Sequence, residues 1–333
     1  MATTPITASR QLGAAGPNVS AVALGCMAMS GMYGASDDSE SIATIHEALD
    51  SGIHLLDTGD FYGMGHNEML IGRALRDRRD QALISVKFGA QRSPDGTWIG
   101  YDARPAAVKT WLAYTLRRLG VDHIDIYRPA RLDPKVPIED TVGAIKEMID
   151  AGYVRYAGLS EVGPETIRRA AAVHPICDLQ IEYSLISRSP ERTIFPALKE
   201  LGIGVTAYGI LSRGLLSESK VQAQGDIRNR FPRFHGENLQ QNQRLVAVLK
   251  DFAARKGVTP VQLAIAWVLA KGDFIVPLIG ARTRRQLRES LGGFSLQLSA
   301  SDLVQLEEAV PPSAVAGTRY DEHQMKVLDS EKS

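Results

Sequence analysis

The chain has 333 residues, of which 44% are hydrophobic and 23% are charged, and its 38 lysines and arginines balance its 38 aspartates and glutamates. This composition is typical of a soluble globular protein, and the zero formal net charge argues against a nucleic-acid-binding protein or a polybasic membrane partner, because both need a concentrated positive field. No apolar run approaches the roughly 20 residues of a membrane span, and residues 1–10 lack the apolar core of a signal peptide. We therefore expect a cytoplasmic protein.

Two cysteines, Cys26 and Cys177, both lie in apolar segments. We expect buried free thiols, as in a reducing compartment, rather than a disulfide. Neither the cysteines nor the seven histidines show metal-ligand spacing, so we expect no metal site.

The first two short apolar segments flank Gly16-Pro17-Asn18 and predict a β-hairpin. From there one unit recurs, an apolar strand followed by an amphipathic helix. The predicted strands cover residues 22–25, 53–57, 82–87, 123–130, 154–160, 178–184, 204–210 and 274–280. The predicted helices that belong to them cover residues 36–52, 67–78, 103–119, 137–152, 164–173, 193–201, 260–271 and 283–291.

Eight strand–helix units with continuously apolar strands predict an α/β fold of the (β/α)8 barrel type, also called a TIM barrel. An open doubly wound sheet is the alternative architecture. Two further helices, 239–256 and 300–309, lie outside the eightfold scheme. We expect one domain over residues 1–316, followed by a polar tail, 317–333, that is flexible or partly draped over the barrel mouth.

A candidate site lies where the predicted strands end, which is where (β/α)8 barrels carry their active sites. Asp57, Lys87, Ser160, Ser184 and Tyr208 all fall at such carboxyl ends.

Tyr62 follows the Asp57 strand closely. A buried carboxylate and ammonium need to pair, and a paired ammonium beside a phenol favours the ionised phenol. Asp57, Tyr62 and Lys87 are therefore interpreted as a proton-transfer unit; a structural ion pair with a nearby surface tyrosine is the alternative.

The spacing D-T-x-x-x-Y-G at residues 57–63, followed by the strand that ends in Lys87, resembles the aldo-keto reductases. The resemblance spans essentially the whole chain. Other segments that follow the family's order are Leu24-Gly25-Cys26-Met27, Gly65-His66-Asn67-Glu68, Leu159-Ser160-Glu161, Gln180-Ile181-Glu182-Tyr183-Ser184, Ala207-Tyr208-Gly209-Ile210-Leu211 and Pro277-Leu278-Ile279-Gly280-Ala281-Arg282.

By this resemblance, Tyr62 is the general acid that protonates a carbonyl oxygen while NADPH delivers hydride to the carbon. Lys87, paired with Asp57, lowers the pKa of the phenol. Ser160 and Gln180 hold the nicotinamide amide, and Tyr208 stacks on its ring. The structural alternatives are a strand-end cap for Ser160, a satisfied polar strand residue for Gln180, and core packing for Tyr208.

The resemblance also implies the rest of the cofactor site. Gly280 opens a helix that carries several arginines, and a helix start with fixed cations suits an anionic phosphate. Arg282 with Gln286 would bind the adenosine 2′-phosphate, which favours NADP over NAD, whereas a solvated basic helix face is the alternative. Glu289 and Ser290 would reach the adenine, although the family more often has Asn at position 290. The loop that crosses the pyrophosphate contributes Gly209, Leu211, Arg213 and Gly214.

One residue departs from the family pattern. The fourth strand usually ends in a histidine that helps to position the carbonyl oxygen, and Ala130 stands there. Period-two alternation puts Arg128 on the same face, one layer deeper. Either Arg128, or a water beside Ala130, stabilises the oxyanion, or Arg128 pairs with a buried carboxylate.

The expected pocket walls are Met27, Phe61, Trp98 and a loop over residues 225–243. Their apolar and aromatic character favours a hydrophobic carbonyl over a free sugar. We predict an NADPH-dependent reductase of a small-molecule aldehyde or ketone, as a monomer or homo-oligomer. The alternatives are an NADP-binding regulatory barrel and an enzyme that oxidises an alcohol or sugar.

Overall fold

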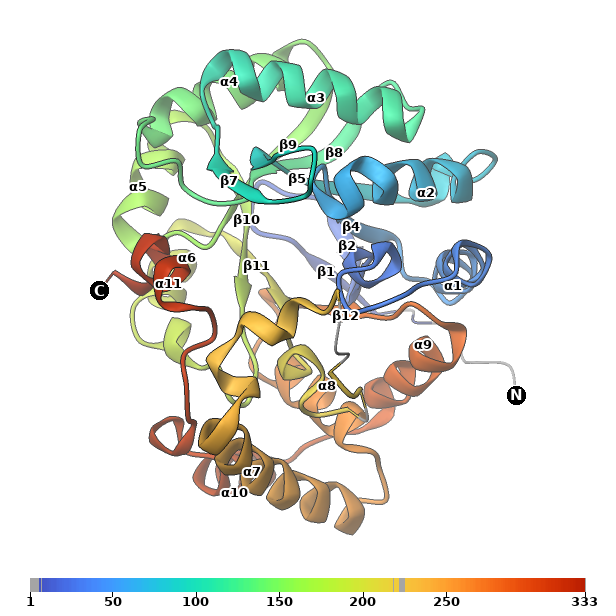
Figure 1. Cartoon of the computed structure of the whole chain (residues 1–333), viewed down its shortest axis with the longest axis vertical. Helices are drawn as coiled ribbons and strands as arrows, with labels where there is room; N and C mark the ends of the chain where they lie inside the picture. Colours follow the sequence, from blue (N-terminus) through green and yellow to red (C-terminus); the bar gives the residue numbers. More distant parts are fainter. Residues whose placement is uncertain (1–5, 7, 218, 222–224, 333) are drawn as a thin grey trace.

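The computed structural model describes residues 6, 8–217, 219–221 and 225–332. Eight parallel strands close into a barrel in the order β10-β11-β12-β3-β4-β5-β8-β9, and helices surround it (Figure 1). The barrel strands are β3 (Ala23–Gly25), β4 (Leu55–Gly59), β5 (Leu83–Phe88), β8 (Ile124–Pro129), β9 (Val154–Ser160), β10 (Ile176–Glu182), β11 (Gly204–Tyr208) and β12 (Ile275–Gly280). The predicted (β/α)8 barrel is confirmed, and the open sheet is wrong.

The helices that alternate with these strands follow the predicted order. They are α1 (Asp38–Asp50), α2 (His66–Ala74), α3 (Pro105–Leu119), α4 (Ile138–Asp150), α5 (Pro164–Val173), α6 (Ile194–Leu201), α8 (Pro260–Ala270) and α9 (Arg284–Leu291). The additional helices are α7 (Gly236–Arg255), α10 (Ala300–Ala309) and α11 (Glu322–Val327). Short 3₁₀ helices cover Met27–Ser30, Tyr62–Gly65, Arg79–Gln81, Ser189–Glu191, Ser212–Gly214, Ile227–Arg230, Pro232–Phe234, Gly292–Ser295, Pro312–Ala314 and Asp329–Glu331.

Two antiparallel hairpins lie outside the barrel. The first, β1 (Ser9–Gln11) with β2 (Asn18–Ser20), is the hairpin predicted from its turn residues. The second, β6 (Ala90–Arg92) with β7 (Trp98–Tyr101), was not predicted and follows the carboxyl end of β5.

Many predicted boundaries differ from the structure by a few residues; β4, for example, covers Leu55–Gly59, so Asp57 lies two residues before its end. Strand β10 ends at Glu182, so Ser184 lies past the strand rather than at its end. Helix α2 ends at Ala74, four residues early, because Leu75 leaves helical geometry. The expected loop over 225–243 is interrupted by α7, which begins at Gly236.

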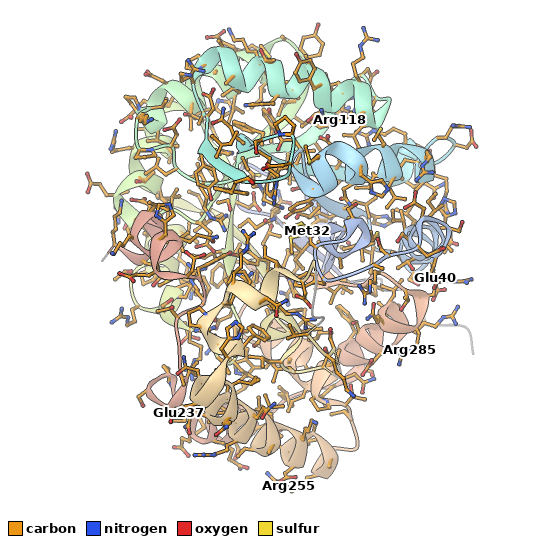
Figure 2. The ribbon with its side chains drawn as sticks, in the orientation of Figure 1. Met32, Glu40, Arg118, Glu237, Arg255 and Arg285 are labelled. Carbon is orange, nitrogen blue, oxygen red and sulfur yellow. The ribbon has the colours of Figure 1, made fainter. Side chains whose placement is uncertain are left out.

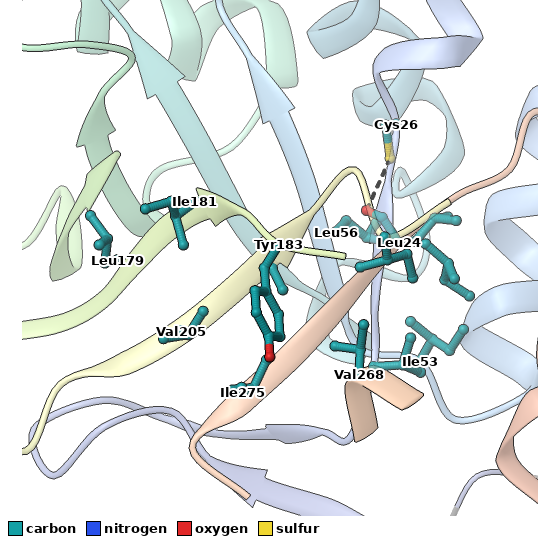
Figure 3. Close-up of a cluster of buried hydrophobic side chains, with 14 of the residues drawn as sticks. Leu24, Cys26, Ile53, Leu56, Leu179, Ile181, Tyr183, Val205, Val268 and Ile275 are labelled. Atoms are coloured by element: carbon teal, nitrogen blue, oxygen red, sulfur yellow. Dashed lines mark hydrogen bonds between the residues drawn. The ribbon is translucent and has the colours of Figure 1, made fainter. Parts of the chain in front are cut away.

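The apolar core fills the layer between the barrel and its helices. Leu24, Leu56, Leu179, Val205 and Ile275 come from five different barrel strands and are all fully buried (Figure 3). Strands that are apolar on consecutive residues bury both faces, one against the helices and one inside the barrel. The periodicity of the sequence therefore encodes the barrel directly.

Both cysteines are buried free thiols, as predicted. The thiol of Cys26 lies 3.8 Å from the carbonyl oxygen of Leu24, within the same core (Figure 3). Burial raises the pKa of the Cys177 thiol well above its usual value. The thiols therefore behave as small apolar groups.

The C-terminal segment lies against the carboxyl ends of β9 and β11. The backbone N–H of Ser330 donates to the carbonyl of Glu161 at 3.2 Å, and the hydroxyls of Tyr320 and Tyr208 are 2.7 Å apart. Ser333 and residues 1–5 and 7 lie outside the described residues. None of the described helices combines the length and the apolar character that crossing a membrane requires. The cytoplasmic location stays a prediction.

Candidate active site

An ion pair inside the barrel mouth joins two neighbouring strands. The register pairs Gly59 of β4 with Lys87 of β5, which brings the Asp57 carboxylate within reach of the lysine. Lys87 Nζ donates to Asp57 Oδ1 at 2.5 Å, while Ser85 Oγ and Gln180 Nε2 donate to Oδ2 at 2.9 and 2.7 Å. Both charged groups are buried. A buried pair of this kind is tolerated because its charges are matched and hydrogen-bonded.

Tyr62 lies beside this pair, in the 3₁₀ turn that follows β4. Its side chain is 6% exposed, and Lys87 Nζ is 5.1 Å from the centre of its ring. Burial raises the pKa of Tyr62 well above that of a free tyrosine, and the charge of Asp57 adds to the effect. The expectation that this pKa is lowered is wrong for this structure, because burial outweighs the nearby cations. Tyr62 is therefore a protonated phenol, the form that a general acid needs.

Two polar side chains from β9 and β10 end near this pair. Gln180 donates to Asp57 rather than pointing free into the mouth. Ser160, the last residue of β9, is buried, and its hydroxyl has no hydrogen-bond partner among the described residues. A buried hydroxyl without a partner is costly, and such atoms are common where a ligand binds.

Tyr208 at the end of β11 is tied to Glu161 and Tyr320. Its hydroxyl donates to Glu161 Oε1 at 2.7 Å. Glu161 also accepts from Arg319 of the C-terminal segment through both carboxylate oxygens, and Arg319 holds the pKa of the carboxyl below its usual range although burial alone would raise it. Glu161 has a left-handed backbone, with φ at 56°. Such strain in a non-glycine residue is frequent at functional sites.

The loop after β11 is held by Arg213. Its guanidinium donates to Glu182 Oε2 at 2.8 Å and lies 4.4 Å from the rings of both Phe231 and Tyr320. A Cβ on Gly214, whose φ is +94°, would lie 2.9 Å from Arg228 Nη1. In this loop the close approach of Arg228 leaves little room for a side chain at Gly214, and Arg213 is both stacked on aromatic rings and paired with Glu182. Gly209 and Leu211 lie in the same loop, ahead of its 3₁₀ turn.

The arginines around α9 separate into two kinds. Arg284 and Arg288 of α9 pair with carboxylates of α1. The two helices are adjacent, and the labels Glu40 (α1) and Arg285 (α9) show where they lie in Figure 2. The guanidinium of Arg282, in contrast, donates to the backbone carbonyls of Tyr33 and Ala35 at 3.0 and 3.1 Å.

The side chain of Gln286 accepts from the backbone N–H of Arg282 at 3.1 Å, which fixes the turn that precedes α9. A Cβ at Gly280 would meet no atom within 4 Å. Ser290 is buried in α9, and the carbonyl of Glu289 accepts from Gln262.

Arg128 occupies a different place from the one expected of an oxyanion-stabilising group. It is fully buried inside the barrel, and its Nη2 donates to Asp178 Oδ1 at 3.0 Å. Its Nε and Nη1 have no partner among the described residues. The geometry therefore favours the alternative in which Arg128 pairs with a buried carboxylate.

An aromatic row flanks Tyr62. Phe61 packs edge-on against the Tyr62 ring, with centroids 4.7 Å apart, and Trp98 of β7 lies 6.1 Å from Phe61. Tyr101 packs against Trp98 at 5.2 Å. Met27, two residues past the end of β3, is partly exposed. The structure thus brings two of the three predicted wall residues together and adds Tyr101.

A family model described as the aldo/keto reductase family matches residues 21–311. The chain belongs to the aldo/keto reductase family. The "Probable aldo-keto reductase 1" of Glycine max is 40% identical over 317 residues, covering 93% of this chain and 91% of that protein. The Schizosaccharomyces pombe aldo-keto reductase yakc, whose name specifies NADP(+), is 36% identical over 311 residues, covering 91% and 92%.

Solved aldo-keto reductases share the barrel. The glycerol dehydrogenase AKR11B4 from Gluconobacter oxydans has a TM-score of 0.82 at 28% identity, covering 91% of this chain and 96% of that one. The holo form of aldo-keto reductase AKR11C1 from Bacillus halodurans has a TM-score of 0.76 at 27% identity, covering 95% and 99%. The predicted family and fold are confirmed.

Sequence reasoning missed the groups that the C-terminal segment brings to the mouth. Arg319 and Tyr320 lie in a polar tail without a motif, and no periodicity points to their partners. It also missed Arg131, which follows Ala130 directly. The chain leaves the strand at Pro129, so the alternation that singled out Arg128 does not extend to Arg131.

Proposed function

We propose that this aldo-keto reductase uses NADP(H) and reduces an aldehyde or ketone to an alcohol, with Tyr62 as the general acid. The observation that carries the proposal is the buried Asp57–Lys87 ion pair beside the buried phenol of Tyr62. NADPH, when bound, supplies the hydride.

The proton comes from the chain itself. Tyr62 donates its phenolic proton to the carbonyl oxygen, and the charge of the Lys87 ammonium, which lies over the ring 5.1 Å from its centre, stabilises the phenolate that forms. Burial lowers the pKa of Lys87, and the charge and hydrogen bond of Asp57 oppose this shift, which favours the charged ammonium. A positioned general acid typically contributes about 10²–10⁴-fold to the rate.

The residues present fit the nicotinamide end of the cofactor. The unpartnered hydroxyl of Ser160 supplies a hydrogen bond to the nicotinamide amide. Gln180 uses Nε2 on Asp57, which leaves its Oε1 as the acceptor for the same amide. Tyr208 provides an aromatic face at the end of β11, with its hydroxyl already fixed by Glu161.

The residues around α9 fit a phosphate. Arg282 has no carboxylate partner among the described residues, and Gly280 leaves room beside it. In the first turn of α9 the N–H groups of Arg284 and Gln286 already donate to Glu40 and Thr283, so the guanidinium of Arg282 is the group that suits a phosphate. We assign the adenosine 2′-phosphate to Arg282 with Gln286. The name of the S. pombe relative, which specifies NADP(+), supports the assignment.

The remaining cofactor and substrate contacts complete the proposal. The loop with Arg213 lies against the pyrophosphate, and the substrate carbonyl enters beside the aromatic row at Tyr62. The further residues are Gly209, Leu211 and Gly214 for the pyrophosphate, Glu289 and Ser290 for the adenine, and Met27, Phe61 and Trp98 for the substrate.

Fluorescence titration with NADPH and NADH, followed by a nitro-substituted benzaldehyde in the same cuvette, tests the function. We expect tighter NADPH binding and oxidation of NADPH when the aldehyde is added. Tyr62→Phe should keep the affinity for NADPH and lose turnover by about 10²–10⁴-fold. Binding of neither nucleotide, or full turnover by Tyr62→Phe, would contradict the proposal.

Oxidation of an alcohol is the second candidate. The glycerol dehydrogenase among the solved relatives favours it, because the same residues serve either direction. An assay with NADP⁺ and a panel of alcohols at alkaline pH measures the rate of oxidation. A rate of oxidation below the rate of aldehyde reduction would favour reduction, and a higher rate would favour alcohol oxidation.

A further inference from the structure

Arg131 lies at the mouth, where the chain leaves β8. The N–H of Ala130 donates to the carbonyl of Phe88 at 2.8 Å, which ties this turn to β5, the strand of Lys87. The guanidinium of Arg131 donates through Nη1 to the carbonyl of Ala130 at 2.6 Å and through Nη2 to the hydroxyl of Tyr320 at 2.9 Å.

The charge of Arg131 is not matched by an ion pair. Among the described residues, its hydrogen bonds go to a carbonyl and a phenol, and no carboxylate lies within ion-pair distance. The other cations around Tyr62 and Tyr208 each have a carboxylate partner, although Arg213 and Arg233 share one. Lys87 pairs with Asp57, Arg319 with Glu161, and Arg213 and Arg233 pair with Glu182.

The guanidinium of Arg131 lies next to the proposed reaction centre. Its neighbour Ala130 is bonded to Phe88, which follows Lys87. The hydroxyl of Tyr320, which the guanidinium binds, is 2.7 Å from the hydroxyl of Tyr208.

The charge of Arg131 opposes the burial that raises the pKa of Tyr62, and it acts with burial to lower the pKa of Lys87. Because the Asp57–Lys87 pair is neutral as a unit, Arg131 leaves the space beside Tyr62 with a surplus positive charge. A neutral carbonyl compound leaves this surplus in place, whereas an anionic substrate neutralises it.

We propose that Arg131 binds a carboxylate of the substrate, so that the preferred substrates are carbonyl compounds that carry a carboxylate, such as aromatic 2-oxo acids and carboxybenzaldehydes. This inference rests on the proposed carbonyl reduction and names its substrate class. A guanidinium suits the role because its planar donors match the two oxygens of a carboxylate. The aromatic row of Phe61, Trp98 and Tyr101 lies on the apolar part of such a substrate.

Paired acids and methyl esters test the assignment. The pairs are phenylglyoxylate with methyl phenylglyoxylate, and 4-carboxybenzaldehyde with methyl 4-formylbenzoate; each pair keeps the carbonyl and removes the charge. We expect kcat/KM to be about 10- to 100-fold higher for at least one acid than for its ester, as for a charge-assisted hydrogen bond. Arg131→Gln should abolish this ratio, because kcat/KM should fall much further for the acid than for its ester, which loses only the effect of the Arg131 charge on Tyr62 and Lys87.

Two variants separate charge recognition from a structural role. Tyr320→Phe removes the hydroxyl that Arg131 binds and keeps the cation, so the acid-to-ester ratio should persist. Arg131→Lys keeps the charge without the planar fork and should retain part of the ratio. Urea unfolding of each variant shows whether the fold is intact.

The outcomes are distinct from those of the function test. Equal kcat/KM for acids and esters in the unmodified protein would overturn the assignment of Arg131. An equal loss of kcat/KM for acids and esters in Arg131→Gln would also overturn it. Neither result would affect the proposed carbonyl reduction. If no carbonyl compound is reduced, the same pairs are titrated against the NADPH complex by cofactor fluorescence. Tighter binding of an acid that is lost in Arg131→Gln supports the assignment, and equal binding overturns it.

Discussion

Arg128 and Asp178 form an ion pair that crosses the interior of the barrel from β8 to β10, with Nη2 and Oδ1 3.0 Å apart and both side chains fully buried. Gly158 of β9 lies between them: a Cβ there would be 2.6 Å from Asp178 Oδ1 and 3.0 Å from Arg128 Nε. Thr206 of β11 also donates to Asp178. One buried polar cluster therefore joins β8, β10 and β11, and Gly158 of β9 packs against it.

Removing one partner of this pair should destabilise the protein rather than act on catalysis alone. Arg128→Met leaves the Asp178 carboxylate buried without its cation, which typically costs about 3–5 kcal/mol. Urea denaturation measures the loss. The double variant with Asp178→Leu should recover most of it, because replacing both partners by apolar groups is often neutral. Arg169→Met, which breaks a surface pair with Glu139, serves as the control and should change little.

A methyl group at Gly158 should disturb the same cluster. Gly158→Ala forces either the carboxylate or the guanidinium to move, and overpacking of this kind typically costs about 1–3 kcal/mol. Gly143→Ala is the matched control: this glycine lies inside α4, and a Cβ there meets no atom within 4 Å. It should stabilise the protein by up to about 1 kcal/mol. Equal melting temperatures for the two variants would contradict the close approach seen at Gly158.

The fold could be predicted from the sequence because each strand–helix unit carries its own periodicity. Strand β9 and helix α10 match the predicted residues fully. The ion pair of Asp57 and Lys87 could also be predicted, since both residues lie near the carboxyl ends of adjacent parallel strands.

Contacts between distant loops could not be predicted. The bond between Tyr208 and Tyr320 joins residues 112 positions apart, and no local pattern encodes it. Arg128 shows a second limit. Alternation gives the face of a strand residue, but whether the side chain meets a ligand or a carboxylate depends on the opposite strand, here Asp178 of β10.

Asp60 should make stability depend on pH. Burial, with a contribution from Glu68, raises its pKa from 3.8 to about 7, while the N–H of Gly89 and the charge of Arg118 oppose the shift. The folded protein therefore binds more protons than the unfolded chain between about pH 4 and pH 7, so this group's contribution to stability is lost as pH rises through that range.

Asp60→Asn should remove this contribution. Chemical denaturation at pH 5, 6, 7 and 8 measures the difference between the variant and the unmodified protein. The variant should gain relative stability with rising pH, because it has no charge to bury. A difference that is constant across the four pH values would contradict the raised pKa. Asp50→Asn, at a largely exposed carboxylate, serves as the control.

Arg282 should determine the choice between NADPH and NADH. Arg282→Gln removes the cation assigned to the 2′-phosphate, and the loss of a hydrogen bond to a charged group predicts about 10- to 100-fold weaker NADPH binding, with NADH binding little changed. Arg284→Gln makes the same change in net charge at a residue that pairs with Glu40. Fluorescence titration of both variants separates the local contact from the general field, and an equal effect of the two would argue against the assignment.

Arg319 should hold the C-terminal segment on the barrel mouth. Its guanidinium binds both carboxylate oxygens of Glu161, and both side chains are buried, so Arg319→Met leaves an unpaired buried carboxylate at a typical cost of about 3–5 kcal/mol. Arg319 also keeps the pKa of Glu161 below its unfolded value of 4.5, so the pair's contribution is present above that pH and is lost as the pH falls through the lower folded pKa. The destabilisation by Arg319→Met should therefore be larger at pH 7 than at pH 3. Lys326→Met, in the exposed pair with Glu322 of α11, should have little effect at either pH. Equal melting temperatures for Arg319→Met and the unmodified protein at pH 7 would show that the segment is held by other contacts.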